Sequence, residues 1–150
     1  KKRNIRILLP EDSVIADAFS NEANTRTVQS DNIPEGWMGL DIGPKARDAY
    51  SAAIRASKTI LWNGPMGVFE MSKFEEGTRA TATAIAEATA KGAYSLIGGG
   101  DSAAAVNKFG MHDRVSYVST GGGALLEYLE GKKLPGVEAI LREESSAPIT

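Results

Sequence analysis

The sequence predicts an α/β protein in which a parallel sheet carries helices on both faces. Two observations support this fold class. From residue 38 onward, short apolar segments alternate with longer segments of helical periodicity, which is the pattern of repeated strand–helix units. The short segments run apolar rather than alternating, as expected for strands that are covered on both sides. We therefore expect a doubly wound, Rossmann-like arrangement.

The strand–helix units follow one another in a regular order. Before them, WMGLDIGP (37–44) is a short apolar run that ends in Gly-Pro. The predicted strands are TILW (59–62), AYSLI (93–97) and RVSYVS (114–119). The predicted helices are 45–58, 74–91, 101–109 and 124–131, and the last three end at Gly92, Gly110 and Gly131.

Both ends of the chain are less regular. IRILLP (5–10) predicts one more strand, whereas 11–36 is polar and Asn-rich, so we expect irregular chain there with one edge hairpin near 25–29. The segment 141–150 has little apolar face, which predicts a loosely ordered tail. A sheet of four or five strands would leave its edges uncovered, so we expect the chain to be part of a longer one.

Composition and charge exclude several classes of protein. The 150 residues, 42% of them hydrophobic, suffice for one globular domain. The net charge of −2 is spread over 17 basic and 19 acidic residues, so we expect neither nucleic acid nor a membrane surface as a partner. The chain has no cysteine and no apolar segment near the length of about 18 residues that a membrane span needs. We expect a soluble, cytoplasmic protein.

Glycine is concentrated where the predicted strands end. Eight of the 16 glycines fall in NGPMG (63–67), GGG (98–100) and GGG (121–123), and DIGP (41–44) is a fourth such junction. The carboxyl ends of parallel strands lie at one edge of a sheet, where ligands bind. Glycine lets backbone N–H groups face outward, and each following helix adds the positive end of its dipole. These loops predict an anion-binding edge, best suited to phosphates.

Single residues in these loops allow two interpretations each. Asp101 occupies the place of a helix N-cap, so its local sequence favours a capping role over a role as a metal ligand. Ser102 is either a first-turn helix residue or a phosphate donor, and Glu70 is either an exposed loop charge or a ligand. A lone GGG is more often a turn than a phosphate cradle, but three Gly-rich loops at one edge favour a ligand.

Apolar residues flank the NGPMG loop. Trp62, at a strand end, is expected in the core. Val68 and Phe69 lie beside a flexible polar loop and are better explained as the wall of a site for a flat ligand such as a base.

The motifs of several enzyme classes are missing. There is no G-x-x-x-x-G-K-[ST] P-loop, and no G-x-G-x-x-G fingerprint with an acidic residue about 20 positions on, so dinucleotide binding is unsupported. His112 is the only histidine, and it cannot complete a Ser-His-Asp triad or a zinc site.

Longer motifs make the chain resemble a known family. LWNGPMGVFE (61–70), IGGGDSAAA (97–105) and VSTGGGALLEYLEGKKLPGVEA (118–139), in this order and spacing, resemble phosphoglycerate kinase, as do GWMGLDIGP (36–44) and ILLPEDSVIADAF (7–19). The resemblance runs from about Ile5 to Ile140. It implies that residues 1–140 are the second half of a nucleotide-binding domain plus the C-terminal segment, an incomplete domain of a two-domain enzyme.

The resemblance implies a reaction and its partners. The family transfers a phosphoryl group reversibly between 1,3-bisphosphoglycerate and ADP, giving 3-phosphoglycerate and ATP, with Mg²⁺. ADP or ATP would bind to this chain, phosphoglycerate would bind through the missing N-terminal half, and the complete enzyme would be a monomer. Because catalysis there needs two domains to close on each other, we expect the isolated chain to be inactive or nearly so.

The resemblance also assigns roles to individual residues. It implies that the nucleotide pocket is shaped by Gly39, Asn63, Pro65, Gly67, Val68 and Phe69, with Glu70 at the ribose hydroxyls. It implies phosphates at Gly99, Gly100 and Ser102, and the metal at Asp101, which reverses the order of the two interpretations of that residue. Gly121, Gly122 and Gly123 would face the phosphoryl group in transfer. Ser102 stands where the family commonly has Thr, and it keeps the hydroxyl.

Two other functions remain as alternatives. The first is a non-catalytic nucleotide-binding or interaction module that keeps this half of the fold. The second, a dinucleotide oxidoreductase, is disfavoured by the missing fingerprint.

Overall fold

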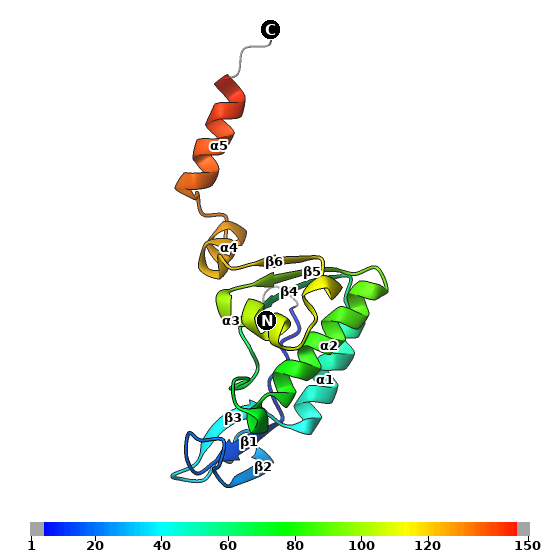
Figure 1. Ribbon diagram of the computed structural model, residues 1–150, viewed down its shortest axis with the longest axis vertical. Helices are drawn as coiled ribbons and strands as arrows, with labels where there is room; N and C mark the ends of the chain where they lie inside the picture. Colours follow the sequence, from blue (N-terminus) through cyan, green and yellow to red (C-terminus); the bar gives the residue numbers. More distant parts are fainter. Residues whose placement is uncertain (1–4, 147–150) are drawn as a thin grey trace.

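The computed structural model describes residues 5–146 and contains two three-stranded sheets with helices beside them (Figure 1). The first sheet is antiparallel, in the order β2-β1-β3, and the second is parallel, in the order β4-β5-β6. The strands are β1 (Asp12–Ala16), β2 (Thr25–Gln29), β3 (Met38–Ile42), β4 (Thr59–Asn63), β5 (Tyr94–Gly98) and β6 (Tyr117–Ser119). The helices are α1 (Pro44–Arg55), α2 (Glu76–Ala90), α3 (Gly100–Lys108), α4 (Gly122–Leu129) and α5 (Pro135–Ser146), with the short 3₁₀ helices η1 (Ser72–Phe74) and η2 (His112–Arg114). None of the helices within residues 5–146 is long and apolar enough to span a membrane.

The parallel sheet packs its core against one layer of helices. Burial alternates along β4, where Ile60 and Trp62 are buried and Leu61 is exposed. Ile60 and Trp62 share a core cluster with Ile97 of β5 and with the apolar faces of α2 and α3. The predicted α/β fold with a parallel sheet is therefore confirmed. Helices α2 and α3 cover the same face because the three strands lie side by side in chain order, and both connections turn in the same direction.

The opposite face of this sheet is largely open in the part of the chain that the structure describes. Leu61, Leu96 and Tyr117 are neighbours in register across the three strands, and Leu61 and Tyr117 are exposed by 42% and 59%. Helix α4 reaches this face where Leu125 lies 3.0 Å from the position of a Cβ atom on Gly98. The apolar side chains of the strands thus fit a second covered face, of which α4 supplies one part.

The antiparallel sheet lies at the end of the molecule opposite α5 (Figure 1). The edge hairpin expected near 25–29 is confirmed, because β2 pairs with β1. Strand β1 itself lies in a segment expected to be irregular, and β3 pairs with β1 rather than joining the parallel sheet. The polar start of β1 has a structural reason: the buried Asp12 carboxylate accepts the Lys45 and Ala46 N–H groups at the start of α1 (3.1 and 2.8 Å).

Both ends of the chain differ from expectation. The strand predicted at 5–10 is wrong, because none of the described strands pairs with this segment, and Ile5 and Leu9 are 70% and 79% exposed. The expected loose tail begins at residue 141, but α5 continues to Ser146 and projects from the body (Figure 1). Pro135 at the helix start and helix-forming residues such as Ala139 and Leu141 favour this helix, although Ile140 and Leu141 are exposed. Residues 147–150 of the expected tail lie outside the described residues.

Candidate functional site

The three parallel strands end in register. Asn63 of β4 is the neighbour of Gly98 of β5, which lies beside Ser119 of β6. The three Gly-rich loops that follow therefore leave the sheet at one edge, as predicted. The fourth junction, DIGP, follows β3 in the other sheet, but it still lies close to the first loop. The Val68 N–H donates a hydrogen bond to the Leu40 carbonyl in β3 (2.9 Å).

The loop after β4, residues 63–70, is fixed by hydrogen bonds from its own backbone. The Gly64 N–H donates to Ser102 Oγ (2.7 Å), and the Met66 and Gly67 N–H groups donate to Thr78 Oγ1 (3.1 and 3.2 Å). These N–H groups point into the protein, whereas we expected Gly-rich loops to direct them outward. This loop is therefore suited to be the wall of a site rather than an anion cradle.

The other two Gly-rich loops bring two helix N-termini together. A Cβ atom on Gly122 would lie 2.6 Å from the Cα atom of Gly99, so the backbones meet directly at the starts of α3 and α4. Gly99 also has φ +95°, a conformation that favours glycine. The first N–H groups of each helix have no intrahelical acceptor. Two positive helix ends therefore converge at this edge, which is an arrangement that attracts phosphates.

A cleft of about 320 Å³ opens between β3 and the loop 63–70. Four of the residues predicted for the nucleotide pocket line it: Gly39, Pro65, Gly67 and Val68. Asn63 lies nearby at the end of β4, with its Oδ1 atom 3.0 Å from the position of a Cβ atom on Gly99. The structure thus brings four of the predicted pocket residues together in one cleft and places a fifth, Asn63, next to the start of α3.

Comparison with known proteins identifies the family. The family model described as phosphoglycerate kinase matches residues 1–132. This chain belongs to the phosphoglycerate kinase family. The phosphoglycerate kinases of Prosthecochloris aestuarii and Chloroflexus aurantiacus are 62% and 59% identical to it, over 92% and 93% of this chain. The alignments cover 35% of each relative, so the chain spans about a third of the length of the curated relatives it matches.

Solved phosphoglycerate kinase structures share the fold. The enzyme from Coxiella burnetii is 42% identical with a TM-score of 0.86, and the match covers 95% of this chain and 36% of that one. The enzyme from Pyrococcus horikoshii is 29% identical with a TM-score of 0.76, over 92% of this chain and 33% of that one. The family resemblance read from the sequence motifs is therefore confirmed.

The remaining predicted phosphoglycerate kinase residues have varied surroundings. Phe69 is only 5% exposed and belongs to the core, so its side chain does not form an exposed wall as expected; burying such a ring is strongly favourable. Ser102 is fully buried and accepts the Gly64 N–H. Glu70 is exposed beside the loop. In the last Gly-rich loop Gly121 and Gly123 are exposed, and Gly122 is buried.

Asp101 is not the N-cap of α3. The helix begins at Gly100 after Gly99 in the cap position, and no side chain bonds to the first turn there. Asp101 is exposed in the first turn. Within residues 5–146, no group of three or more His, Cys, Asp or Glu side chains could hold a metal ion. The single exposed carboxylate of Asp101 fits Mg²⁺, which commonly takes one or two carboxylates and completes its coordination with phosphates and water.

Two polar residues that the sequence reasoning did not single out support the cleft. The Asp41 carboxylate is 6% exposed and accepts the Gly77 N–H (2.7 Å) and the Ile42 N–H (2.8 Å). Burial raises the pKa of Asp41 to about 6. Thr78, which holds the loop, is fully buried. An Asp inside an apolar strand, and a Gly-Thr pair at the start of a helix, are the signals that could have identified them.

Lys108, the last residue of α3, joins three parts of the site. Its Nζ donates to the Phe69 carbonyl (2.5 Å) and pairs with Glu75 (2.7 Å). Glu75 also pairs with Arg79. The hydrogen bond from Lys108 contributes most to holding the pKa of Glu75 below its usual value. The end of α3 is thereby tied to the loop and to the start of α2.

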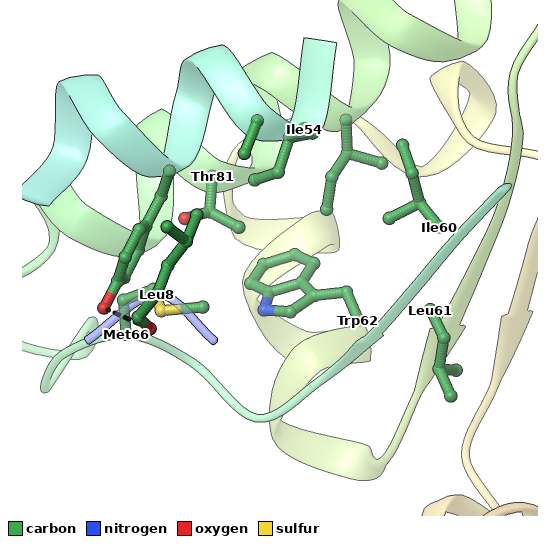
Figure 2. A pocket seen from close by; sticks show the side chains of 10 residues that line it. Leu8, Ile54, Ile60, Leu61, Trp62, Met66 and Thr81 are labelled. Atoms are coloured by element: carbon green, nitrogen blue, oxygen red, sulfur yellow. Dashed lines mark hydrogen bonds between the residues drawn. The ribbon is translucent and has the colours of Figure 1, made fainter. Parts of the chain in front are cut away.

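A second cavity, of about 250 Å³, lies on the helix side of β4 (Figure 2). Trp62, Ile54 and Met66 are among its apolar lining residues, and Leu8 closes it on one side, where Tyr50 Oη donates to the Leu8 carbonyl (3.3 Å). Trp62 is a core residue as predicted, at 4% exposure, and its Nε1 has no hydrogen-bond partner within the described residues. Because the walls are apolar, this cavity is unsuited to a phosphate.

Proposed function

We propose that this chain is the nucleotide-binding part of a phosphoglycerate kinase. The reaction is the Mg²⁺-dependent, reversible transfer of a phosphoryl group between 1,3-bisphosphoglycerate and ADP, giving 3-phosphoglycerate and ATP. The observation that carries the proposal is the meeting of two helix N-termini, at Gly99 and Gly122, beside the cleft of β3 and the loop 63–70. Phosphoglycerate would bind through the part of the family's chain that lies outside these residues.

The cleft would take the base and the ribose. The residues proposed to shape it are Gly39, Asn63, Pro65, Gly67, Val68, Phe69 and Glu70. Gly39 and Gly67 let a flat base approach the backbone, and Val68 adds an apolar surface. Phe69 acts from the core, where it supports the loop from below. The exposed Glu70 carboxylate is available to accept hydrogen bonds from ribose hydroxyls.

The converging helix ends would hold the phosphates. Gly99, Gly100 and Ser102 belong to the loop and first turn of α3, and Gly121, Gly122 and Gly123 would face the phosphoryl group in transfer. Phosphoryl transfer asks mainly for positioning and for stabilisation of negative charge, which backbone N–H groups at helix N-termini supply. Asp101 would hold Mg²⁺, which neutralises phosphate charge when it is bound.

The test uses the complete enzyme and the Mg²⁺ dependence of its turnover. Asp101→Ala should raise the Mg²⁺ concentration needed for half-maximal turnover by about 10-fold or more, the usual effect of losing a group that supports a metal. Asp113→Ala removes another exposed carboxylate, in η2 after the C-terminal end of α3, and should leave the Mg²⁺ dependence unchanged. Turnover is measured with a coupled assay over a range of Mg²⁺ at fixed ADP.

Two results would contradict the proposal. The first is an unchanged Mg²⁺ dependence in Asp101→Ala, which would remove Asp101 from the metal site. The second is nucleotide binding by the complete protein without any phosphoryl transfer, which would favour the non-catalytic nucleotide-binding module.

A further inference from the structure

Asp41 is a buried carboxyl group for which the proposed reaction has no direct use. It is 6% exposed and lies in β3, on the wall of the cleft. Each of its oxygens accepts one backbone N–H: Oδ2 from Gly77 in the first turn of α2 (2.7 Å) and Oδ1 from Ile42 (2.8 Å). Burying a carboxylate costs free energy unless such donors compensate the charge. A buried carboxylate in an apolar strand is therefore a candidate for a functional role.

The backbone encloses this carboxyl group on two sides. A Cβ atom on Gly67, in the loop, would lie 2.6 Å from the Asp41 carboxyl carbon, and one on Gly77 would lie 3.0 Å from it. Neither position leaves room for a methyl group. The Asp41 side chain therefore fills the space between the loop 63–70 and the start of α2, and it cannot change orientation unless one of them moves.

The charges around Asp41 are few. Arg47 of α1 favours the ionised carboxyl group and Glu76 of α2 disfavours it, while the Gly77 and Ile42 hydrogen bonds favour ionisation. Burial outweighs these effects and raises the pKa of Asp41 to about 6. The carboxyl group is thus ionised at neutral pH and takes up a proton in mild acid.

We propose that Asp41 is a positioning residue for the nucleotide: its ionised carboxylate ties the start of α2 to β3, so that Thr78, next to Gly77, holds the loop 63–70 and keeps the cleft in its binding shape. This inference rests on the proposed function. Protonation removes the buried charge, which stabilises the fold, but it also weakens one of the two hydrogen bonds, because the hydroxyl oxygen of a carboxylic acid is a poorer acceptor than a carboxylate oxygen. The cleft would loosen, and nucleotide affinity would fall.

Asp41→Asn reproduces the protonated state permanently, because an amide has the shape of a carboxyl group but only one acceptor oxygen. In the complete enzyme at pH 8, we expect this variant to raise the KM for ADP about five-fold, the factor that corresponds to about 1 kcal/mol for one hydrogen bond. At pH 5.5 the ratio of the two KM values should approach one, because the wild-type carboxyl group is then largely protonated. Taking the ratio at each pH cancels the titration of ADP and of its Mg²⁺ complex.

A stability measurement separates positioning from general damage. Since the pKa of Asp41 is raised from 3.8 to about 6 in the folded protein, its contribution to stability is fully present below pH 3.8 and is lost as the pH rises through about 6. Asn does not ionise and so does not lose this contribution. The urea concentration at the midpoint of unfolding should therefore rise for Asp41→Asn, relative to that of the wild type, between pH 5 and pH 8. If the variant binds ADP less well while its stability relative to wild type rises with pH, the weaker binding comes from a change in the cleft and not from a less stable fold.

The control is Asp48→Asn on α1, an exposed carboxyl group that should leave the KM for ADP unchanged at both pH values. The inference would be overturned if the KM for ADP of Asp41→Asn, divided by that of the wild-type enzyme, is near one at pH 8 or does not change with pH.

Should the variant fail to fold, hydrogen exchange at the Met66 and Gly67 amides of the wild-type enzyme replaces the kinetic test. Protection, corrected for the intrinsic rate, should fall below pH 6, and constant protection would refute the role. Absence of ADP turnover in the wild-type enzyme would instead reject the proposed function itself.

Discussion

The contact between Gly99 and Gly122 sets the spacing of the two helix N-termini. Without side chains, the two backbones approach until a Cβ atom on Gly122 would lie 2.6 Å from Gly99 Cα and 2.8 Å from Gly99 N. Any larger residue at position 122 must separate α3 from α4, because a backbone atom cannot give way as a flexible side chain can. The residue type at one position thus decides whether two sets of N–H groups without intrahelical acceptors can face the same ligand.

Gly122→Ala should therefore lower the turnover of the complete enzyme by at least about 10-fold, since the loss of one well-placed donor to a transition-state charge costs about 10²–10³ in related cases. The added methyl group displaces α4, and the Gly121–Gly123 N–H groups move with it. Gly136→Ala is the matched control, because a Cβ atom there meets nothing within 4 Å at the start of α5. Turnover of Gly122→Ala equal to that of Gly136→Ala would contradict this account of the contact.

The sequence identified residues whose chemistry shows in a local pattern and missed those that act across the fold. The Gly clusters and Asp101 stand at strand ends, where the direction of a parallel sheet makes their position predictable. The hydrogen bond from the Gly77 N–H to Asp41 joins positions 36 residues apart, so no local sequence pattern predicts it. Phe69 follows a flexible polar loop and is therefore predicted in the wall of a ligand site, whereas its side chain is buried in a core cluster with residues of α2 and α3.

At the scale of elements, Lys108 holds α3 against the loop 63–70. Its Nζ donates to the Phe69 carbonyl and pairs with Glu75, whose side chain is only 11% exposed. Lys108→Met should raise the KM for ADP several-fold and destabilise the enzyme by about 1–3 kcal/mol, because a buried carboxylate loses one of its two cationic partners. Both quantities are measured in the complete enzyme, by steady-state kinetics and by urea unfolding.

Lys132→Met is the matched control for this substitution. Lys132 pairs with Glu127 and Glu130 at the surface, with 56% of its side chain exposed, so its removal should cost at most about 1 kcal/mol and leave the KM for ADP unchanged. Lys108→Arg should recover part of the lost affinity, since it keeps the charge beside Glu75. Equal effects of Lys108→Met and Lys132→Met would show that the loop does not depend on this contact.

Elements that bury a regular apolar face could be predicted, and elements that depend on a partner elsewhere could not. The helices α1 to α4 and the strands β4 to β6 repeat a pattern that local sequence determines, although η2 delays the start of β6 to Tyr117. Strand β1 escaped prediction because polar residues such as Asp12 cap a neighbouring helix from within it. The segment 5–10 has a strand-like sequence, but strand structure also needs a paired neighbour.

At the scale of the whole molecule, the described residues place the proposed nucleotide site on a sheet with one open face. Leu61 and Tyr117 are exposed there, on neighbouring strands. Large exposed apolar groups in one region mark surfaces that contact other protein. The chain spans about 35% of the length of the relatives it matches, and the open face agrees with the proposal that the site works with further protein around it.

The isolated 150-residue chain should accordingly turn over ADP and 1,3-bisphosphoglycerate at well under about 1% of the rate of the complete enzyme. The helix ends at Gly121 and Gly123 are exposed, so water competes with the acceptor for the phosphoryl group, whereas closure of two domains excludes it. The described residues are proposed to supply donors for the nucleotide, and the groups that orient phosphoglycerate are expected in the rest of the enzyme.

A coupled assay on the purified chain, beside the complete enzyme at equal molar concentration, measures the difference in turnover. Circular dichroism shows whether the isolated chain is folded, so that loss of structure is not mistaken for loss of catalysis. Normal turnover by the folded chain would mean that these residues hold both substrates and shield the transfer from water on their own.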